Sequence, residues 1–156
     1  MQAPRYTRRA ALALALATSA LFMMPAADAE PLPADALVGI WEADDGTVKL
    51  DMFKAGSEFQ AHMLYGNEIV EADNVTFKKD ANNPDPALRS RSLKNIVFIT
   101  GLRWTEGEWS GGSIYDASSG RTYNCKAEIR NGKMGLRGYL GIPAMGQTRT
   151  FHRVRG

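Results

Sequence analysis

Residues 121–140, RTYNCKAEIRNGKMGLRGYL, decide the fold class of this chain. In the first half of the stretch, every second position holds an apolar or small side chain: Tyr123, Cys125, Ala127 and Ile129. Because successive side chains of a strand point to opposite faces, this spacing predicts a half-buried β-strand. Asn131-Gly132 then separates two alternating runs, and this pair favours a two-residue hairpin because both of its positions adopt positive φ. The stretch therefore predicts an antiparallel hairpin.

The same alternation recurs along most of the chain, with short turns between the runs. Further hairpin turns are predicted at Ala55-Gly56-Ser57, Glu106-Gly107-Glu108 and Ser118-Ser119-Gly120. Consecutive hairpins favour a meander, and closing a meander into a barrel removes its exposed edges. We therefore predict an all-β fold, a closed antiparallel up-and-down barrel of about eight strands, with a two-sheet sandwich as the alternative. The strands are expected to start near Val38, Val48, Glu58, Asn95, Trp109, Arg121, Lys133 and Gln147.

One segment, residues 66–93, interrupts this pattern and contains no alternating run longer than Val75-Thr76-Phe77. Loops of this length within a compact domain are usually functional or disordered. Inside the segment, Asp85 precedes Pro86, which is a favourable start for a short helix. The carboxylate accepts from free backbone N–H groups, and proline suits the first helical position. We therefore expect one long loop that carries a short helix.

The N-terminal residues have the layout of a secretory signal peptide. Three arginines, Arg5, Arg8 and Arg9, precede an uncharged run over residues 10–24 that is mostly Ala and Leu. Ala27-Asp28-Ala29 then fits the small-x-small pattern of a cleavage site. The sequence thus predicts a signal peptide over residues 1–29 and a single domain over residues 30–156. It also predicts bacterial export to the periplasm or the medium.

The charge balance changes when the predicted signal peptide is set apart. Residues 1–29 hold three of the 19 basic and one of the 17 acidic side chains, so residues 30–156 carry no net charge. This balance gives no electrostatic basis for binding nucleic acid or an anionic membrane surface. We expect no nucleic-acid partner and no membrane-spanning segment after signal cleavage.

Recognisable catalytic constellations are absent from the sequence. It contains no His pair at metal-ligand spacing, no Cys pair, no nucleophile elbow and no glycine-rich phosphate loop. The two histidines, His62 and His152, lie far apart in the chain. We therefore expect no enzyme, no metal site and no cofactor. The single cysteine, Cys125, cannot close an internal disulfide, and the alternation around it predicts a buried core residue.

Several motifs together resemble an exported bacterial family catalogued as domain of unknown function 2147. The resemblance implies a lipocalin-like β-barrel in the periplasm or cell envelope, and it implies no activity. The chain departs from the family pattern in three ways: it lacks the paired cysteines around residues 54–61, and Ser92 and Phe151 stand where Pro and Trp are frequent. The motifs that carry the resemblance are Gly39-Ile40-Trp41, Asn83–Leu93, Trp109–Asp116, Gly120–Tyr123, Leu136–Gly141 and Thr150–Val154.

A barrel of this size either fills itself with side chains or holds one small ligand. Small residues at positions predicted to face inward leave space for a ligand, or else they alternate with large ones to fill the taper of the barrel. Both alternatives stay open for the small set Ala61, Cys125, Ala127 and Gly138. The first hypothesis is binding of a small apolar or fatty-acid-like amphipathic ligand. Its candidate residues are Trp41, Phe59, Arg89, Arg91, Tyr123 and Tyr139.

Arg89 and Arg91 allow two interpretations. Either they receive an anionic head group at the barrel mouth, or they pair with Asp80 or Asp85 and fasten the long loop. We favour the second interpretation, in which Asp80, Asn83 and Asp85 form a structural loop motif. The alternative function is a cell-envelope interaction protein with a filled barrel that docks a partner through this loop. A hydrolase or isomerase with an unrecognised site is the least favoured hypothesis.

Overall fold

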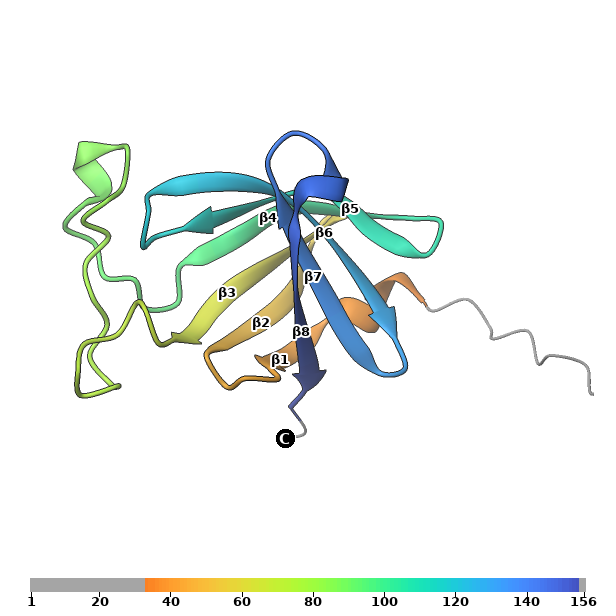
Figure 1. The fold of residues 1–156 in the computed structure, drawn as a ribbon, viewed down its shortest axis with the longest axis horizontal. Helices are drawn as coiled ribbons and strands as arrows, with labels where there is room; N and C mark the ends of the chain where they lie inside the picture. Colours follow the sequence, from red (N-terminus) through yellow and green to blue (C-terminus); the bar gives the residue numbers. More distant parts are fainter. Residues whose placement is uncertain (1–32, 155–156) are drawn as a thin grey trace, which may run out of the picture. The chain divides into compact units, whose positions relative to one another are not determined.

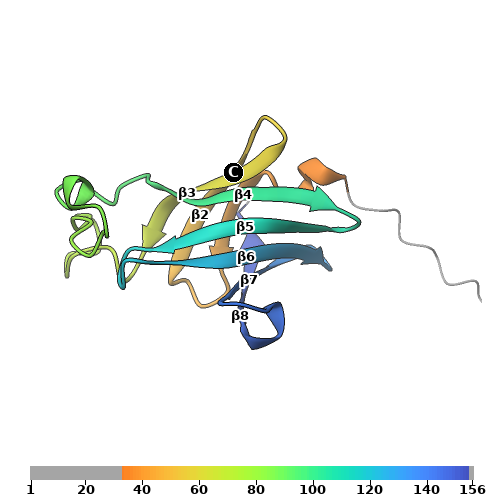
Figure 2. The ribbon, with the colours of Figure 1, turned by 90° about the horizontal axis from the view of Figure 1, so that it is seen from above.

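The computed structural model describes residues 33–154, so the predicted signal peptide lies outside the described residues. Within this range the chain forms one closed barrel of eight antiparallel strands in sequential order, with β8 pairing back onto β1 (Figures 1 and 2). This closure confirms the predicted meander and excludes the sandwich. The strands are β1 (Gly39–Ala43), β2 (Val48–Ala55), β3 (Glu58–Gly66), β4 (Val97–Thr105), β5 (Glu108–Asp116), β6 (Arg121–Arg130), β7 (Lys133–Tyr139) and β8 (Gln147–Arg153).

The hairpin that decides the fold forms as the sequence predicts. Asn131 and Gly132 have φ angles of 51° and 75°, and the flanking residues Arg130 and Lys133 are paired across the turn. On β6, Cys125 and Ala127 are buried, and Cys125 is fully shielded from solvent. The inner face of β6 is therefore the one that the alternation predicts.

A 3-10 helix at the N-terminal side, η1 (Ala34–Leu37), closes one end of the barrel. Its carbonyl oxygens accept from two buried indoles: Trp41 Nε1 donates to Leu37 at 2.9 Å, and Trp109 Nε1 donates to Ala34 at 3.0 Å. Arg153 from β8 lies over the Trp41 ring, with 4.3 Å between the guanidinium carbon and the ring centroid. These contacts fix η1 against the apolar core at this end.

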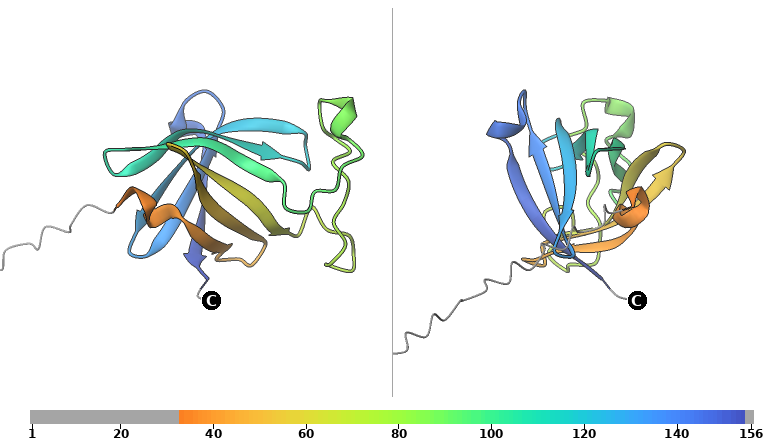
Figure 3. Two further views of the ribbon diagram at one scale, coloured as in Figure 1. Left: turned by 180° about the vertical axis from the view of Figure 1, so that it is seen from behind. Right: turned by 90° about the vertical axis from the view of Figure 1, so that its right-hand side faces the viewer.

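The long segment between β3 and β4, residues 67–96, lies at the opposite end of the barrel from η1 (Figures 1 and 3). Two isolated bridges, Val70 to Phe77 and Lys79 to Ser92, organise it. The expected helix is only a single 3-10 turn, η2 (Pro86–Leu88), because i to i+3 bonds lead directly back into the Lys79–Ser92 bridge. Asp85 caps this turn as predicted, and its side chain accepts from the Ala87 N–H at 2.9 Å.

No helix within residues 33–154 is long and apolar enough to cross a membrane.

Candidate ligand-binding cavity

A cavity of about 1100 Å³ occupies the barrel half that lies away from η1. Strands β2 to β8 line it, together with the turn between β1 and β2, the start of the long segment and the loop between β7 and β8. Up-and-down connectivity places these three connections at the same end of the barrel, so the cavity opens there. Its volume is slightly above the range of about 300–1,000 Å³ for small-molecule pockets.

The interior of the cavity is apolar. The buried side chains of Leu50, Phe98, Leu136 and Phe151 line it. Gly138, on the inner face of β7, leaves space: a β-carbon there would have only Ile114 Cγ2 within 4 Å, at 3.8 Å. An apolar wall of this kind suits an apolar or amphipathic guest.

Small inward residues have two different roles along the barrel. Gly138 leaves part of the cavity open, whereas Ala61, Cys125 and Ala127 lie in the packed core. Packing there is tight, since a β-carbon on Gly112 would lie 3.0 Å from Cys125 Sγ and 2.7 Å from the Leu102 side chain. The two alternatives left open by the sequence, space for a ligand and a filled interior, therefore both occur, one in each half of the barrel.

The rim of the cavity is polar and mostly acidic. Hydrogen bonds from Lys133 and then His152 lower the pKa of the Asp44 carboxyl, and a hydrogen bond from Thr47 lowers the pKa of Asp45. Partial burial raises the pKa of Asp116, but hydrogen bonds from the two serines that follow in the β5–β6 turn outweigh it and lower the pKa overall. These three carboxylates are therefore ionised at neutral pH, each held by local donors.

The domain that forms this barrel and cavity matches the model of a known protein family. Residues 39–153 match the model of a family described as an uncharacterized protein conserved in bacteria, DUF2147. The chain belongs to this family. The match confirms the resemblance seen in the sequence motifs.

Solved structures similar to this DUF2147 chain include protein HP1028 from the human pathogen Helicobacter pylori, which is described as belonging to the lipocalin family. The two chains are 28% identical with a TM-score of 0.64, over 76% of this chain and 83% of HP1028. A point mutant of the fluorescent protein UnaG matches with 12% identity and a TM-score of 0.43, over 78% of this chain and 99% of UnaG. No curated protein matches the chain. The similarity to HP1028 shows that the DUF2147 barrel is lipocalin-like.

Of the residues proposed from the sequence as ligand contacts, Tyr123 and Tyr139 line the cavity. Trp41 and Phe59 do not: they are 1% and 2% exposed, and they belong to the packed core. Phe59 makes an edge-to-face contact with Trp109, with ring centroids 6.4 Å apart. Trp41, Phe59 and Tyr123 face inward, and their depth along the barrel axis decides which of them reaches the cavity. Tyr139 follows the inward-facing Gly138 on β7, so it lies on the opposite face and contributes only to the cavity mouth.

The structural loop motif converges on Asp80, whose side chain is completely buried. Asp80 Oδ2 accepts from Arg91 Nε at 2.9 Å and from Asn83 Nδ2 at 2.7 Å, and Oδ1 accepts from the Tyr115 hydroxyl at 2.5 Å. Burial, and secondarily the bond to Asp80, raises the pKa of Tyr115 to about 12. The cluster therefore ties the long segment to β5.

Arg89 departs from the pairing that we expected. Its Nε donates to the backbone carbonyl of Asn83 at 2.8 Å, and its side chain is exposed. Arg91, by contrast, forms the ion pair with Asp80 at 2.8 Å. Only one of the two arginines thus pairs with a loop carboxylate, because the turn at η2 carries Arg89 away from Asp80. Neither arginine lines the cavity.

The charged residues of the cavity lining were not among the contacts predicted from the sequence: Asp44, Asp45, Glu68 and Asp116, and the cationic Arg149 on β8. The available signal was the alternation Gln147, Arg149, Phe151, whose last member is a buried core residue. Arg149 is easily overlooked because a charged side chain at an inward position breaks the apolar pattern that identifies a strand face.

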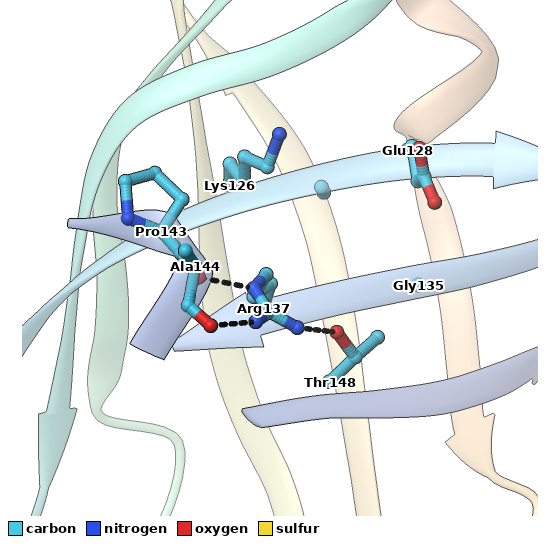
Figure 4. Close-up of a pocket in the computed structure, with 8 residues that line it drawn as sticks. Lys126, Glu128, Gly135, Arg137, Pro143, Ala144 and Thr148 are labelled. Carbon is cyan, nitrogen blue, oxygen red and sulfur yellow. Dashed lines mark hydrogen bonds between the residues drawn. The ribbon is translucent and has the colours of Figure 1, made fainter. Parts of the chain in front are cut away.

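A second, smaller hollow of about 370 Å³ lies on the outer surface of β6, β7 and β8 (Figure 4). Arg137 crosses it and donates to Pro143 O at 2.6 Å, Ala144 O at 3.2 Å and Thr148 Oγ1 at 2.8 Å. These bonds hold η3 (Pro143–Met145) against β7 and β8. The hollow therefore has a structural purpose that differs from that of the cavity.

The histidines stay apart in the fold. His62 Nδ1 lies 3.1 Å from Asn95 O, and its ring stacks on Phe53, whereas His152 Nδ1 lies 3.1 Å from Asp44 Oδ1. Within residues 33–154, no group of three or more His, Cys, Asp or Glu side chains is placed to hold a metal ion.

Proposed function

We propose that this chain is an exported, periplasmic or secreted lipocalin-like protein that holds one small apolar or amphipathic molecule in its barrel. The observation that supports this proposal is the cavity of about 1100 Å³, with an apolar interior and a polar rim. Such a site binds a guest by burying its apolar surface, and a few polar groups at the rim fix its orientation. The proposal contains no catalytic step.

The alternative from the sequence, an envelope protein that docks a partner through its long loop, required a filled barrel. The packed half around η1 agrees with that premise, and the open half does not. Binding inside the barrel is therefore the better-supported function.

Two glycines of β7 allow a sharp test. Gly138 faces the cavity, and Gly135 faces outward, where a β-carbon would have Thr148 Cγ2 at 3.5 Å and Glu128 Cγ at 3.6 Å. Gly138→Leu should fill part of the cavity, whereas Gly135→Leu makes the same change of side chain on the outer face. Neither position has positive φ, so neither substitution strains the backbone.

We expect the fluorescence titration of a neutral apolar probe, N-phenylnaphthylamine, to show binding that Gly138→Leu weakens by about tenfold or more. Gly135→Leu should leave the affinity within about twofold of wild type. Native mass spectrometry of the purified protein should also show added mass from a retained ligand. The proposal fails if wild type takes up no probe, or if Gly138→Leu binds it as tightly as Gly135→Leu does.

A further inference from the structure

Arg149 is a cationic side chain on the inner face of β8. In the register of β7 and β8 it lies opposite Leu136, and Phe151 lies opposite Met134. Leu136 and Phe151 are buried core residues, and alternate residues of a strand share a face, so Arg149 points to the same side as they do. The neighbouring Thr148 points outward, where it accepts from Arg137. Arg149 is accordingly part of the cavity lining, at the open mouth, where its side chain is exposed.

The guanidinium of Arg149 makes few hydrogen bonds within the described part of the protein. Its Nη1 donates to Thr47 Oγ1 at 3.1 Å, and within residues 33–154 it forms no salt bridge. Other arginines of the barrel are engaged more fully: Arg153 donates to Val38 O and Ala36 O, and Arg137 has three acceptors. Most of the Arg149 donors are therefore free to face a guest.

The turn between β1 and β2 orients this guanidinium through Thr47, and the charge of Arg149 contributes, after the hydrogen bonds from Thr47, to the lowered pKa of Asp45. Thr47 Oγ1 donates to Asp45 Oδ1 at 2.6 Å and accepts from Arg149. Asp45 Oδ1 also accepts from the Thr47 N–H at 3.0 Å, so this carboxylate is already held within its own turn. Asp44 is likewise held by Lys133 and His152. The rim thus positions one cation beside an apolar cavity, close enough to Asp45 for the two charges to interact but with no salt-bridge contact among residues 33–154.

We propose that Arg149 is the polar anchor of the cavity, and that the ligand is an amphiphile with a carboxylate head group. A guanidinium presents two parallel N–H donors that match a carboxylate, and such charge-assisted pairs are the stronger hydrogen bonds. The apolar chain of the guest then lies along Leu50, Phe98 and Phe151. This inference rests on the proposed function and specifies its ligand class and anchoring residue. The anchoring residue is then Arg149 and not Arg89 or Arg91, which lie outside the cavity wall.

Two guests that differ only in the head group measure how much the carboxylate contributes to binding. Dodecanoate and dodecanol have chains of the same length and differ in the carboxylate alone. Each is titrated into the purified full chain preloaded with N-phenylnaphthylamine, and the displacement of the probe gives the affinity. We expect wild type to prefer dodecanoate by roughly ten- to hundredfold, the range for a hydrogen bond to a charged partner.

Arg149→Gln should abolish this preference by weakening the binding of dodecanoate much more than that of dodecanol. Arg149→Lys, which keeps the charge and loses the planar fork, should retain an intermediate preference, and it serves as the reporting variant if Arg149→Gln does not fold. Gly138→Leu should weaken both guests equally. The inference is overturned if wild type binds the two guests equally, or if the preference survives in Arg149→Gln. If wild type binds no probe and neither guest, the proposed function fails and the inference fails with it.

Discussion

Asp80 shows how much one buried carboxylate can organise. A buried charge is tolerated only when its oxygens are hydrogen-bonded and its charge is paired. Asp80 meets both conditions through Arg91, Asn83 and Tyr115. Two of these partners come from its own segment and one comes from β5, so a local requirement for pairing creates a contact between distant parts of the chain.

Arg91→Ala should therefore lower the free energy of unfolding by about 2–3 kcal/mol, because it leaves the Asp80 charge buried without its cation. The value is below that for a fully buried pair, since the Arg91 side chain is 38% exposed. Arg89→Ala is the matched control: it removes one bond to a backbone carbonyl, and we expect a change within about 1 kcal/mol. Urea unfolding of both variants measures the difference. A loss for Arg89→Ala equal to that for Arg91→Ala would contradict this assignment.

Cys125 makes the barrel sensitive to alkaline pH. Burial raises the pKa of its thiol to about 12, from 9.0. Above about pH 9 the unfolded thiol releases a proton that the folded thiol keeps, so the unfolded state binds fewer protons and stability falls as pH rises. The stability is fully present below about pH 9 and declines by up to about 1.4 kcal/mol per pH unit above it. Tyr115, whose pKa is also raised, acts in the same direction.

Cys125→Ala should consequently lose less stability than wild type between about pH 8 and pH 11, by about 2–3 kcal/mol. The Tyr115 contribution is common to both proteins and cancels from the comparison. Urea unfolding at the two pH values provides the measurement. Parallel losses in wild type and Cys125→Ala would mean that the thiol ionises as easily in the folded barrel as in the unfolded chain.

At the scale of elements, the long segment docks on the turn between β5 and β6. Asn82 Nδ2 donates to Ser118 O at 2.7 Å, and Asn83 Nδ2 lies 3.3 Å from the Tyr115 hydroxyl. Gly120 in this turn has φ +69°, and a β-carbon there would lie 2.0 Å from Asn82 O. Glycine is therefore required at this position for two reasons: the positive φ angle and the close approach of the segment.

Gly120→Ala should both strain its own turn and displace the segment. Gly132→Ala is the control, because Gly132 has φ +75° and nothing lies within 4 Å of its β-carbon position. We expect a loss of about 1–2 kcal/mol for Gly132→Ala from the positive φ alone. Gly120→Ala should lose about 2 kcal/mol more from overpacking. It should also speed hydrogen exchange at the Asp80 and Leu93 amides, which bond within the segment. Equal effects of the two variants would show that the segment moves aside freely.

For the molecule as a whole, the barrel divides into a packed half and a hollow half. η1, the tryptophans and Phe59 fill the first, and the cavity occupies the second. Core packing and the proposed binding site thereby lie at different ends of the same sheet. A side chain can change in the cavity wall, as in Gly138→Leu, with little effect on the core around η1.

Export is a further prediction about the whole chain. We expect the mature protein to begin at Glu30, because the small-x-small site ends at Ala29 after an uncharged run. Intact-mass analysis of protein recovered from the periplasm or medium measures this directly. Recovery of the chain with residues 1–29 still attached would contradict both the cleavage site and the proposed compartment.

The strands, their turns and their order could be predicted from the amino-acid sequence alone. Alternation such as that of Tyr123, Cys125, Ala127 and Ile129 is a local property, and so is the turn chemistry of Asn131-Gly132. Local signals of this kind act between neighbours along the chain, and a meander of hairpins has few ways to close. For that reason the eight strands and the inner face of β6 were predictable without a structure.

The closed barrel was needed to show which inward residues meet the cavity and which arginine pairs with Asp80. Trp41 and Tyr123 both face inward, yet one lies in the packed core and the other in the cavity wall. Depth along the axis depends on the tilt and stagger of all the strands together, which no single strand encodes. The same holds for Arg149, which reaches Thr47, 102 residues away in sequence, because barrel closure places β8 beside β1.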